Sequence, residues 1–281
     1  MPIRVDRIGT SVAMESAVWE GLKDRAIEIF DEVADNKPSI AATIFETEPA
    51  LDGATMSKIS IPRGSNRSWY MGPSGMVSCY DPKPRAGLGT QSGNLPLISM
   101  ASPNFDIRRA KDVEVAAGIL IQNRDANMMA LLDYSRIVAD VSTSNMMRFV
   151  LEDVTDHGLW KDLGELLSTD ELSDTWGTLC HPDVAKLMMA ACKKHVGNNI
   201  ETSTGVVTVF ESRLVPTSIG GRSVQTLYLL RGGRPGVMAI RKPQLAFLNE
   251  DEVRGSFFLQ RVGFAVEDGS KICVLDAYPK G

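Results

Sequence analysis

Histidine and cysteine are the residues of this chain best suited to metal binding or nucleophilic chemistry. Cys180 lies directly before His181, and Cys192 and His195 form a Cys-x-x-His pair, while His157 stands apart. A zinc site needs at least three converging protein ligands, and no second pair accompanies this one. We therefore interpret Cys192 as a buried thiol and His195 as the end of a helix. The sequence predicts no metal site.

Other catalytic patterns are also missing from the sequence. It contains no G-x-G-x-x-G fingerprint, no Walker loop and no G-x-S-x-G nucleophile motif. Gly220-Gly221 and Gly232-Gly233 lie between expected strands rather than before helices, which is typical of turns. The carboxylates are spread evenly, without a paired-acid constellation. We predict no catalytic residue and no cofactor.

Composition limits the class of protein. The chain has 281 residues, 43% of them hydrophobic, which is enough for one large or two ordinary domains. Its net charge of -5 does not favour electrostatic binding of nucleic acid by the chain as a whole. The sequence contains no run of 18 apolar residues, so we predict no membrane span. Residues 1–14 lack the apolar part of a signal peptide. The four cysteines show no framework spacing, so we expect reduced thiols in a cytosol.

The strongest structural signal is a helical period in residues 111–141. Asp133 and Arg136, and Arg136 and Asp140, are spaced to pair along a polar face. Residues 113–115 alternate like a strand and Gly118 weakens a helix, so the safer part begins near residue 122. Such a helix is usually a core helix. Its expected apolar face comprises Met128, Leu131, Leu132, Ile137, Val138 and Val141.

The rest of the chain divides into a helical part and a β-rich part. Residues 1–13 read as an arm without a core face, before an amphipathic helix at 15–35. A second amphipathic helix is expected at 144–157, and a short one at 159–167. Later elements are a strand at 178–180, a helix from Pro182 to just before Gly197, strands at 206–211, 223–230 and 237–241, and a hairpin of 257–266 with 272–275.

Residues 49–103 differ from the rest of the sequence. They hold half of the chain's 14 prolines, and short strands are expected at 56–61, 69–71, 76–80 and 95–100. So little core capacity over such a length is unusual inside a compact domain. Trp69, Tyr70 and Tyr80 argue against disorder. We therefore favour a projecting loop that packs on a partner, with a solvated loop as the alternative. Its local basic residues are Arg63, Arg67, Lys83 and Arg85.

The order of these elements, with four short motifs, resembles a known family. Leu179-Cys180-His181-Pro182-Asp183 matches a hydrophobic-His-Pro-acidic step from strand to helix. Ser212-Arg213-Leu214-Val215-Pro216 is similar to an S-x-hydrophobic-V-P strand, and residues 236–241 and 260–266 also match. On these motifs the sequence resembles the major capsid protein of tailed bacteriophages, which has the Hong Kong 97-type fold.

The resemblance implies an α+β fold with four parts. These are an N-terminal arm and helix at 1–48, an extended loop at 49–103, a peripheral domain at 104–154 and 250–281, and an axial domain at 155–249. The long helix would form the spine of the peripheral domain. The implied intersubunit contacts are Arg63, Arg67, Trp69, Tyr70, Lys83 and Arg85 in the extended loop, and Gly220, Gly221, Arg222, Arg231 and Arg234 at the axial tips.

The implied function is structural. Pentamers and hexamers of the chain would form an icosahedral phage head around packaged double-stranded DNA, contacted non-specifically. Scaffolding, portal and decoration proteins would be partners, and the virion capsid would assemble in the host cytoplasm. One alternative is an encapsulin-type compartment shell, with Trp19 and Phe30 near a cargo groove. Another is an α+β enzyme whose 49–103 segment is a lid.

Overall fold

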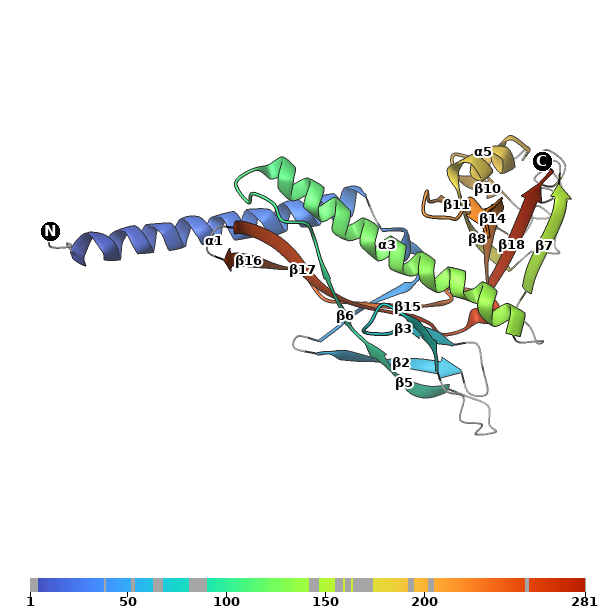
Figure 1. Cartoon of the computed structure of the whole chain (residues 1–281), viewed down its shortest axis with the longest axis horizontal. Coiled ribbons are helices and arrows are strands. Elements are labelled where there is room, and N and C mark those ends of the chain that lie inside the picture. Colours follow the sequence, from blue (N-terminus) through green and yellow to red (C-terminus); the bar gives the residue numbers. More distant parts are fainter. Residues whose placement is uncertain are drawn as a thin grey trace. The chain divides into compact units, whose positions relative to one another are not determined.

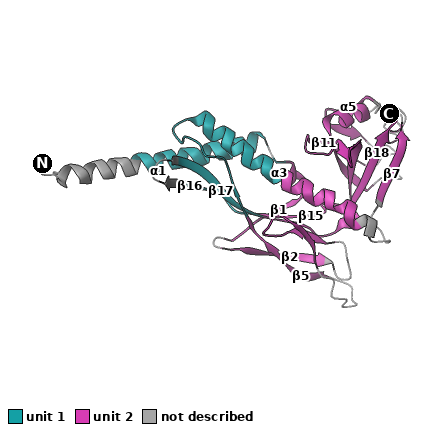
Figure 2. Cartoon of the chain, in the orientation of Figure 1, with its two compact units in different colours: residues 1–39, 99–124, 240–262 teal, residues 40–98, 125–239, 263–281 magenta. Residues whose placement is uncertain are grey.

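The computed structural model describes most of the chain in two compact units. The described residues are 5–37, 39–51, 54–62, 68–80, 90–141, 147–154, 159, 163, 174–191, 195–201, 205–250 and 253–280. Unit 1 comprises residues 1–39, 99–124 and 240–262, and unit 2 comprises residues 40–98, 125–239 and 263–281 (Figure 2). Each unit is described by itself.

Four α-helices and one 3-10 helix have their bounds in the described part of the chain (Figure 1). They are α1 (Val5–Asn36), α2 (Ile40–Ile44), α3 (Ala110–Val141), α5 (Pro182–Ala191) and the 3-10 helix η2 (Gly269–Lys271). Among the described helices, none combines the length and the apolar character needed to cross a bilayer.

Helix α3 confirms the long helix predicted at residues 111–141. Its 32 residues include the stretch that alternates like a strand, and Val113 is fully buried there. Met128, Leu131 and Leu132 are also fully buried, as the apolar period predicts. Ile137 is the exception, because its side chain is 56% exposed.

Helix α1 corrects the prediction of an N-terminal arm at residues 1–13. The helix starts at Val5 rather than near residue 15. The spacing of Val5, Ile8 and Val12 extends the helical period of the following residues backward, which accounts for the longer helix.

Unit 1 is built where α1 meets a long β-hairpin. Strand β16 (Gln244–Glu250) pairs antiparallel with β17 (Val253–Val266), and α1 packs against β16. The ring of Phe258 lies 5.1 Å from Phe30 of α1 and 4.9 Å from Phe105, centroid to centroid. These aromatic contacts are part of the core of this unit.

The last residues of β17 belong to unit 2, where they join the first sheet. Ala265 and Val266 pair with Tyr70 and Trp69, respectively. Strands β1, β15, β17, β3 and β4 follow one another in this sheet. The bounds of its other strands and of the associated ribbon are β1 (Glu46–Pro49), β15 (Gly236–Ile240), β3 (Trp69–Met71), β4 (Val77–Cys79), β6 (Ile98–Ala101), and the ribbon strands β2 (Met56–Pro62) and β5 (Thr90–Pro96).

The second sheet lies entirely in unit 2 and is mixed. Its described strands run in the order β7-β18-β14-β8-β11-β10-β9. They are β7 (Met147–Val154), β18 (Ile272–Pro279), β14 (Gln225–Arg231), β8 (Thr175–Cys180), β11 (Val206–Glu211), β10 (Asn199–Glu201) and β9 (His195–Val196), and a separate small hairpin joins β12 (Ser218–Ile219) to β13 (Arg222–Ser223). The pairs β7–β18 and β8–β11 are parallel, and the others are antiparallel.

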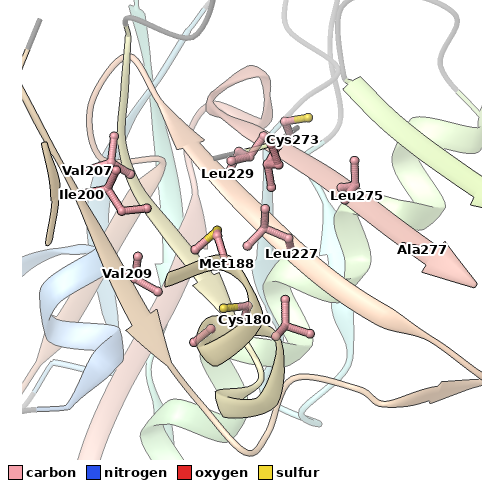
Figure 3. Close-up of a cluster of buried hydrophobic side chains, with 13 residues drawn as sticks. Cys180, Met188, Ile200, Val207, Val209, Leu227, Leu229, Cys273, Leu275 and Ala277 are labelled. Carbon is pink, nitrogen blue, oxygen red and sulfur yellow. The ribbon is translucent and has the colours of Figure 1, made fainter. Parts of the chain in front are cut away.

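Helix α5 follows β8 directly and packs on this second sheet. Met188 of α5 joins Val209, Leu227 and Leu229 in one buried apolar cluster (Figure 3). The predicted strand ending at Cys180 is confirmed, and so is the helix that begins at Pro182. Proline fits the first helical position because the missing N–H has no intrahelical partner there.

The helix predicted at residues 144–157 is wrong, since residues 147–154 form strand β7. Met147, Leu151 and Val154 are spaced as on a helix, but the parallel ladder with β18 stabilises the extended form. His195 was predicted at the end of a helix and instead lies in β9.

The predicted hairpin of 257–266 with 272–275 is also wrong. Its two strands exist as β17 and β18, but they belong to different sheets. Between them, Glu267 and Asp268 both donate their backbone N–H groups to Pro235 O, and Asp268 caps η2. These bonds turn the chain away from a hairpin. Two predicted strands, at 206–211 and 237–241, are confirmed as β11 and β15.

Candidate assembly surfaces

The extended segment 49–103 carries more core residues than its sequence suggested. In its ribbon, Ile59, Ile61 and Leu95 are buried, together with Leu97 just beyond. They pack against Val237, Ala239 and Ala265 in one apolar cluster. The expectation that this segment has too little core capacity is therefore wrong for its described parts, because the sheet of the same unit supplies the missing apolar surface.

Trp69 is also buried within its own subunit. Its side chain is 0% exposed, and its indole N–H donates a hydrogen bond of 2.9 Å to Leu131 O of α3. No surface of the side chain is left for a neighbouring subunit, so we withdraw Trp69 from the predicted contact residues. Tyr70 is half-buried and stacks on Tyr80 at 4.5 Å. Tyr80 donates to Asn94 O, and burial raises the pKa of its hydroxyl.

The ribbon itself presents one polar face. Along β2, Met56, Lys58 and Ser60 are exposed, while Ile59 and Ile61 point into the core. On β5, Thr90, Ser92 and Asn94 are exposed in the same way. This alternation leaves one face of the ribbon free for contact. The predicted contact residues Arg63, Arg67, Lys83 and Arg85 lie outside the described residues.

Glu267 lies where the extended segment joins the sheet. Its backbone oxygen accepts a 2.5 Å hydrogen bond from Ser68 Oγ, just before β3. Burial raises the pKa of its carboxyl, the backbone N–H of Ser60 lowers it, and the negative charge of Glu48 raises it further. This partly desolvated carboxylate, directly after β17, is therefore stabilised by Ser60 of the ribbon and opposed by the like charge of Glu48 in β1.

The residues predicted at the axial tips lie in two separate structures. The first is the turn at residues 231–235. Arg231 Nε donates to Asp174 Oδ1 at 2.7 Å, and Arg234 Nη1 donates to Phe45 O at 3.3 Å. Gly232 and Gly233 have φ values of 61° and 107°, which favour glycine. Both arginines therefore bond within their own subunit and shape the turn.

The second structure is the small hairpin β12–β13. Gly220 and Gly221, with φ values of 59° and 80°, form its two-residue turn, as a type I′ turn requires. Arg222 donates to Glu152 of β7 at 2.5 Å, and its guanidinium lies 4.5 Å from the centre of the Tyr278 ring. Since the Arg222 side chain stays 59% exposed, the hairpin is braced and still accessible.

A buried ionic cluster, missed in the sequence, joins α3 to the second sheet within unit 2. Arg136 contacts Asp276 through two hydrogen bonds, and Thr226 Oγ1 donates to the same carboxylate at 2.8 Å. Tyr228 donates to Asp133, which also pairs with Arg136 as the helical spacing predicted. The signal that could have found this cluster is Asp276 itself, a lone charge between the apolar Leu275 and Ala277 of a strand.

The cysteines and histidines do not converge in the described part of the chain. No group of three potential metal ligands occurs among the described residues. Burial raises the pKa of the Cys180 thiol to about 12 and that of Cys273 to about 11, so both are inert core thiols. Cys192 lies outside the described residues.

The residues considered for a cargo groove behave differently from each other. Phe30 is buried in the core of unit 1. Trp19 is 44% exposed and packs edge-to-face on Phe247, with 5.3 Å between ring centres. Of these two side chains, only that of Trp19 has exposed surface that a cargo protein could contact.

Comparisons with known proteins identify the fold. No protein-family model matches the sequence, and no curated protein matches it. Among solved structures, that of the virus-like particle from Pyrococcus furiosus is similar to this chain, with a TM-score of 0.51 at 10% sequence identity. The match covers 90% of this chain and 98% of the chain in that structure. The chain has the Hong Kong 97-type fold. The α+β class, with α3 as the long helix beside two sheets, confirms the predicted fold.

Two further solved structures match most of the chain. The structure titled Microbacterium phage Oxtober96 matches 86% of this chain and 91% of its own, with a TM-score of 0.51 at 12% identity. The structure of the SrpI encapsulin complex from Synechococcus elongatus PCC 7942 matches 85% of this chain and 87% of that chain, with a TM-score of 0.47 at 13% identity.

Proposed function

We propose that this chain is a shell protein, whose copies assemble into a closed particle. The observation that carries the proposal is the match over 90% of this chain and 98% of a virus-like particle subunit. Because both chains are covered almost fully, the likeness concerns the whole subunit rather than one motif. In a closed shell each interface is repeated by symmetry, so modest contacts sum to a stable particle.

We further propose the role of a major capsid protein of a tailed phage, in pentamers and hexamers of an icosahedral head. The sequence motifs around Pro182 and Pro216 and the fold of the phage protein support this role. Scaffolding, portal and decoration proteins are its proposed partners. The net charge of -5 repels DNA phosphates, so contact with packaged DNA is weak and non-specific.

Assembly contacts are proposed at two places. The first is the extended segment, through Arg63, Arg67, Lys83, Arg85 and the accessible part of Tyr70. The second is the axial side of the molecule.

On that axial side, Gly220, Gly221 and Arg222 make contact directly, while Arg231 and Arg234 act by holding the neighbouring turn. The division into a peripheral domain at 104–154 and 250–281 and an axial domain at 155–249 remains part of the proposal.

The contents of purified particles test the phage role against the encapsulin alternative. Particles are treated with nuclease, disrupted, and analysed for nucleic acid by absorbance and for protein by mass spectrometry. A phage head is expected to contain DNA that the shell protects from the nuclease, or to contain no protein cargo. A single enzyme present at a constant ratio to the shell protein would assign the chain to the encapsulin class instead.

A further inference from the structure

The parallel ladder between β7 and β18 contains a bulge near its end. Its last regular pair joins Leu151 to Ala277. In the next step, Glu152 and Asp153 of β7 lie opposite Tyr278 alone of β18. Asp153 has a φ of 55°, a left-handed conformation that is uncommon outside glycine. Bulges are rare in parallel pairs, and they typically redirect side chains next to functional sites.

The side chains at this bulge meet one residue of hairpin β12–β13. Arg222 Nη2 donates to Glu152 Oε2 at 2.5 Å, and Nη1 donates to Oε1 of the same carboxylate at 3.4 Å. The guanidinium lies 4.5 Å from the centre of the Tyr278 ring. The carboxylate of Glu152 and, more weakly, that of Asp153 raise the pKa of Arg222. All three bulge residues thus interact with a single guanidinium, and we call this set of contacts the brace.

The hairpin itself is too short to hold its tip firmly. Its strands β12 and β13 form a two-stranded sheet apart from the two large ones, with two residue pairs. Short isolated hairpins are at best marginally stable in water. At the base, Val224 is buried and donates its backbone N–H to Thr217 O at 3.0 Å. Residues 220–223 beyond it are exposed, so the brace supplies a restraint that the two short strands lack.

The brace acts on the orientation of the hairpin rather than on the stability of the fold. The side chains of Arg222 and Glu152 are 59% and 51% exposed, and exposed ion pairs contribute little to folding. A guanidinium held by two hydrogen bonds and an aromatic ring is nevertheless restricted in direction. A segment that is already ordered before binding loses less conformational entropy when it binds. A contact made by the hairpin therefore depends on the brace, whereas folding does not.

We propose that Glu152 is a positioning residue, which holds hairpin β12–β13 in the orientation in which it meets a neighbouring copy of the chain. This inference rests on the proposed function, in which Gly220, Gly221 and Arg222 contact the next subunit. Glu152 acts through Arg222 and does not itself contact the neighbouring copy. Because symmetry repeats the hairpin in every copy, each contact of the ring gains from the same restraint.

Neutralising Glu152 tests this role. Glu152→Gln keeps the size of the side chain and removes its charge. In the unassembled subunit, hydrogen exchange in residues 217–224 should become faster, while exchange in β14 and the urea midpoint stay unchanged. The critical concentration for particle assembly, measured by sedimentation, should rise about threefold or more, because each copy must then order its hairpin on binding. Asp106→Asn removes one carboxylate charge from another exposed two-bond pair, with Arg108, and should change none of these values.

A double-mutant cycle separates positioning from direct contact. Arg222→Gln removes the group through which Glu152 acts, so adding Glu152→Gln to it should change neither hydrogen exchange nor the critical concentration further. The exchange readout applies even if Arg222→Gln does not assemble.

Equal effects of Glu152→Gln in both backgrounds would overturn the positioning role, and so would unchanged exchange or unchanged assembly in the single variant. These results would leave the proposed function intact. An unaltered chain that forms no particles, alone or with a scaffolding protein, contradicts the proposed function itself.

Discussion

Arg136 of α3 and Asp276 of β18 form a two-pronged ion pair inside unit 2. The Nη2–Oδ1 distance is 2.8 Å and the Nε–Oδ2 distance is 3.0 Å. The Asp276 side chain is entirely buried and that of Arg136 nearly so. Two charge-assisted hydrogen bonds in this geometry restrict the orientation of both side chains and also stabilise their contact. The pair therefore determines how the end of α3 packs against the second sheet.

Removing one partner of this pair should strongly destabilise the subunit. Asp276→Asn leaves the Arg136 charge buried without its full counter-charge, and such losses cost about 3–5 kcal/mol. Urea denaturation of the unassembled subunit measures the change in unfolding free energy. The exposed pair of Asp106 and Arg108 provides the control, because Asp106→Asn there should have little effect. Equal effects at both pairs would contradict a structural role for the buried pair.

Two glycines should respond in opposite ways to alanine. A Cβ on Gly236 would lie 2.0 Å from Ala265 O, so the backbone of the neighbouring strand must move. We expect Gly236→Ala to lower the unfolding free energy by about 1–3 kcal/mol, as overpacking does. A Cβ on Gly118 in α3 meets nothing within 4 Å, and Gly118→Ala should add about 0.5–1 kcal/mol. Thermal unfolding of both variants checks the signs, and a stable Gly236→Ala protein would refute the close approach.

The carboxyl of Glu267 should make the subunit more stable in mild acid than at neutral pH. Its pKa is raised in the folded chain, so the folded state binds the proton more tightly than the unfolded state. This contribution is fully present below the unfolded pKa near 4.5 and is lost as pH rises through the folded pKa.

Glu267→Gln keeps the acceptor for Ser60 without the charge. It should therefore be more stable than the unaltered chain at pH 7, and the difference should disappear near pH 4.5. Denaturant midpoints of both proteins between pH 4.5 and 8 measure this. A constant difference across that range would show that the charge of Glu267 is not responsible.

Reversing the basic charges of the extended segment should weaken assembly without unfolding the subunit. Lys83→Glu with Arg85→Glu turns a proposed attraction between copies into repulsion. Sedimentation should show fewer particles and more free subunits, with unchanged circular dichroism. Lys186→Glu reverses one exposed lysine of α5, away from the extended segment in the sequence, and serves as the control for a surface charge reversal. Unaltered assembly in the double variant would remove both residues from the interface.

The sequence predicted those elements whose pattern is local. Helix α3 follows from a helical period that persists to residue 141, and the step from β8 to α5 follows from Pro182 after a buried strand. The apolar spacing of β7 looked helical because the pairing that decides its conformation comes from β18, far along the chain.

Contacts between distant residues account for the other differences. Trp69 looked available to a partner because its acceptor, Leu131 O, belongs to another element. The pairing of Asp276 with Arg136 could not be predicted from spacing for the same reason. Ile137 belongs to the apolar period of α3, yet no described residue covers it, and the exposed side chain is consistent with the proposed assembly.

Electron microscopy of the chain expressed alone, combined with sedimentation velocity, tests the central claim most directly. The proposed shell function predicts closed particles, or rings with five- and six-fold symmetry, that sediment far faster than a 30.6 kDa monomer. Co-expression with a scaffolding protein is the matched second condition. A folded monomer under both conditions would contradict the shell function.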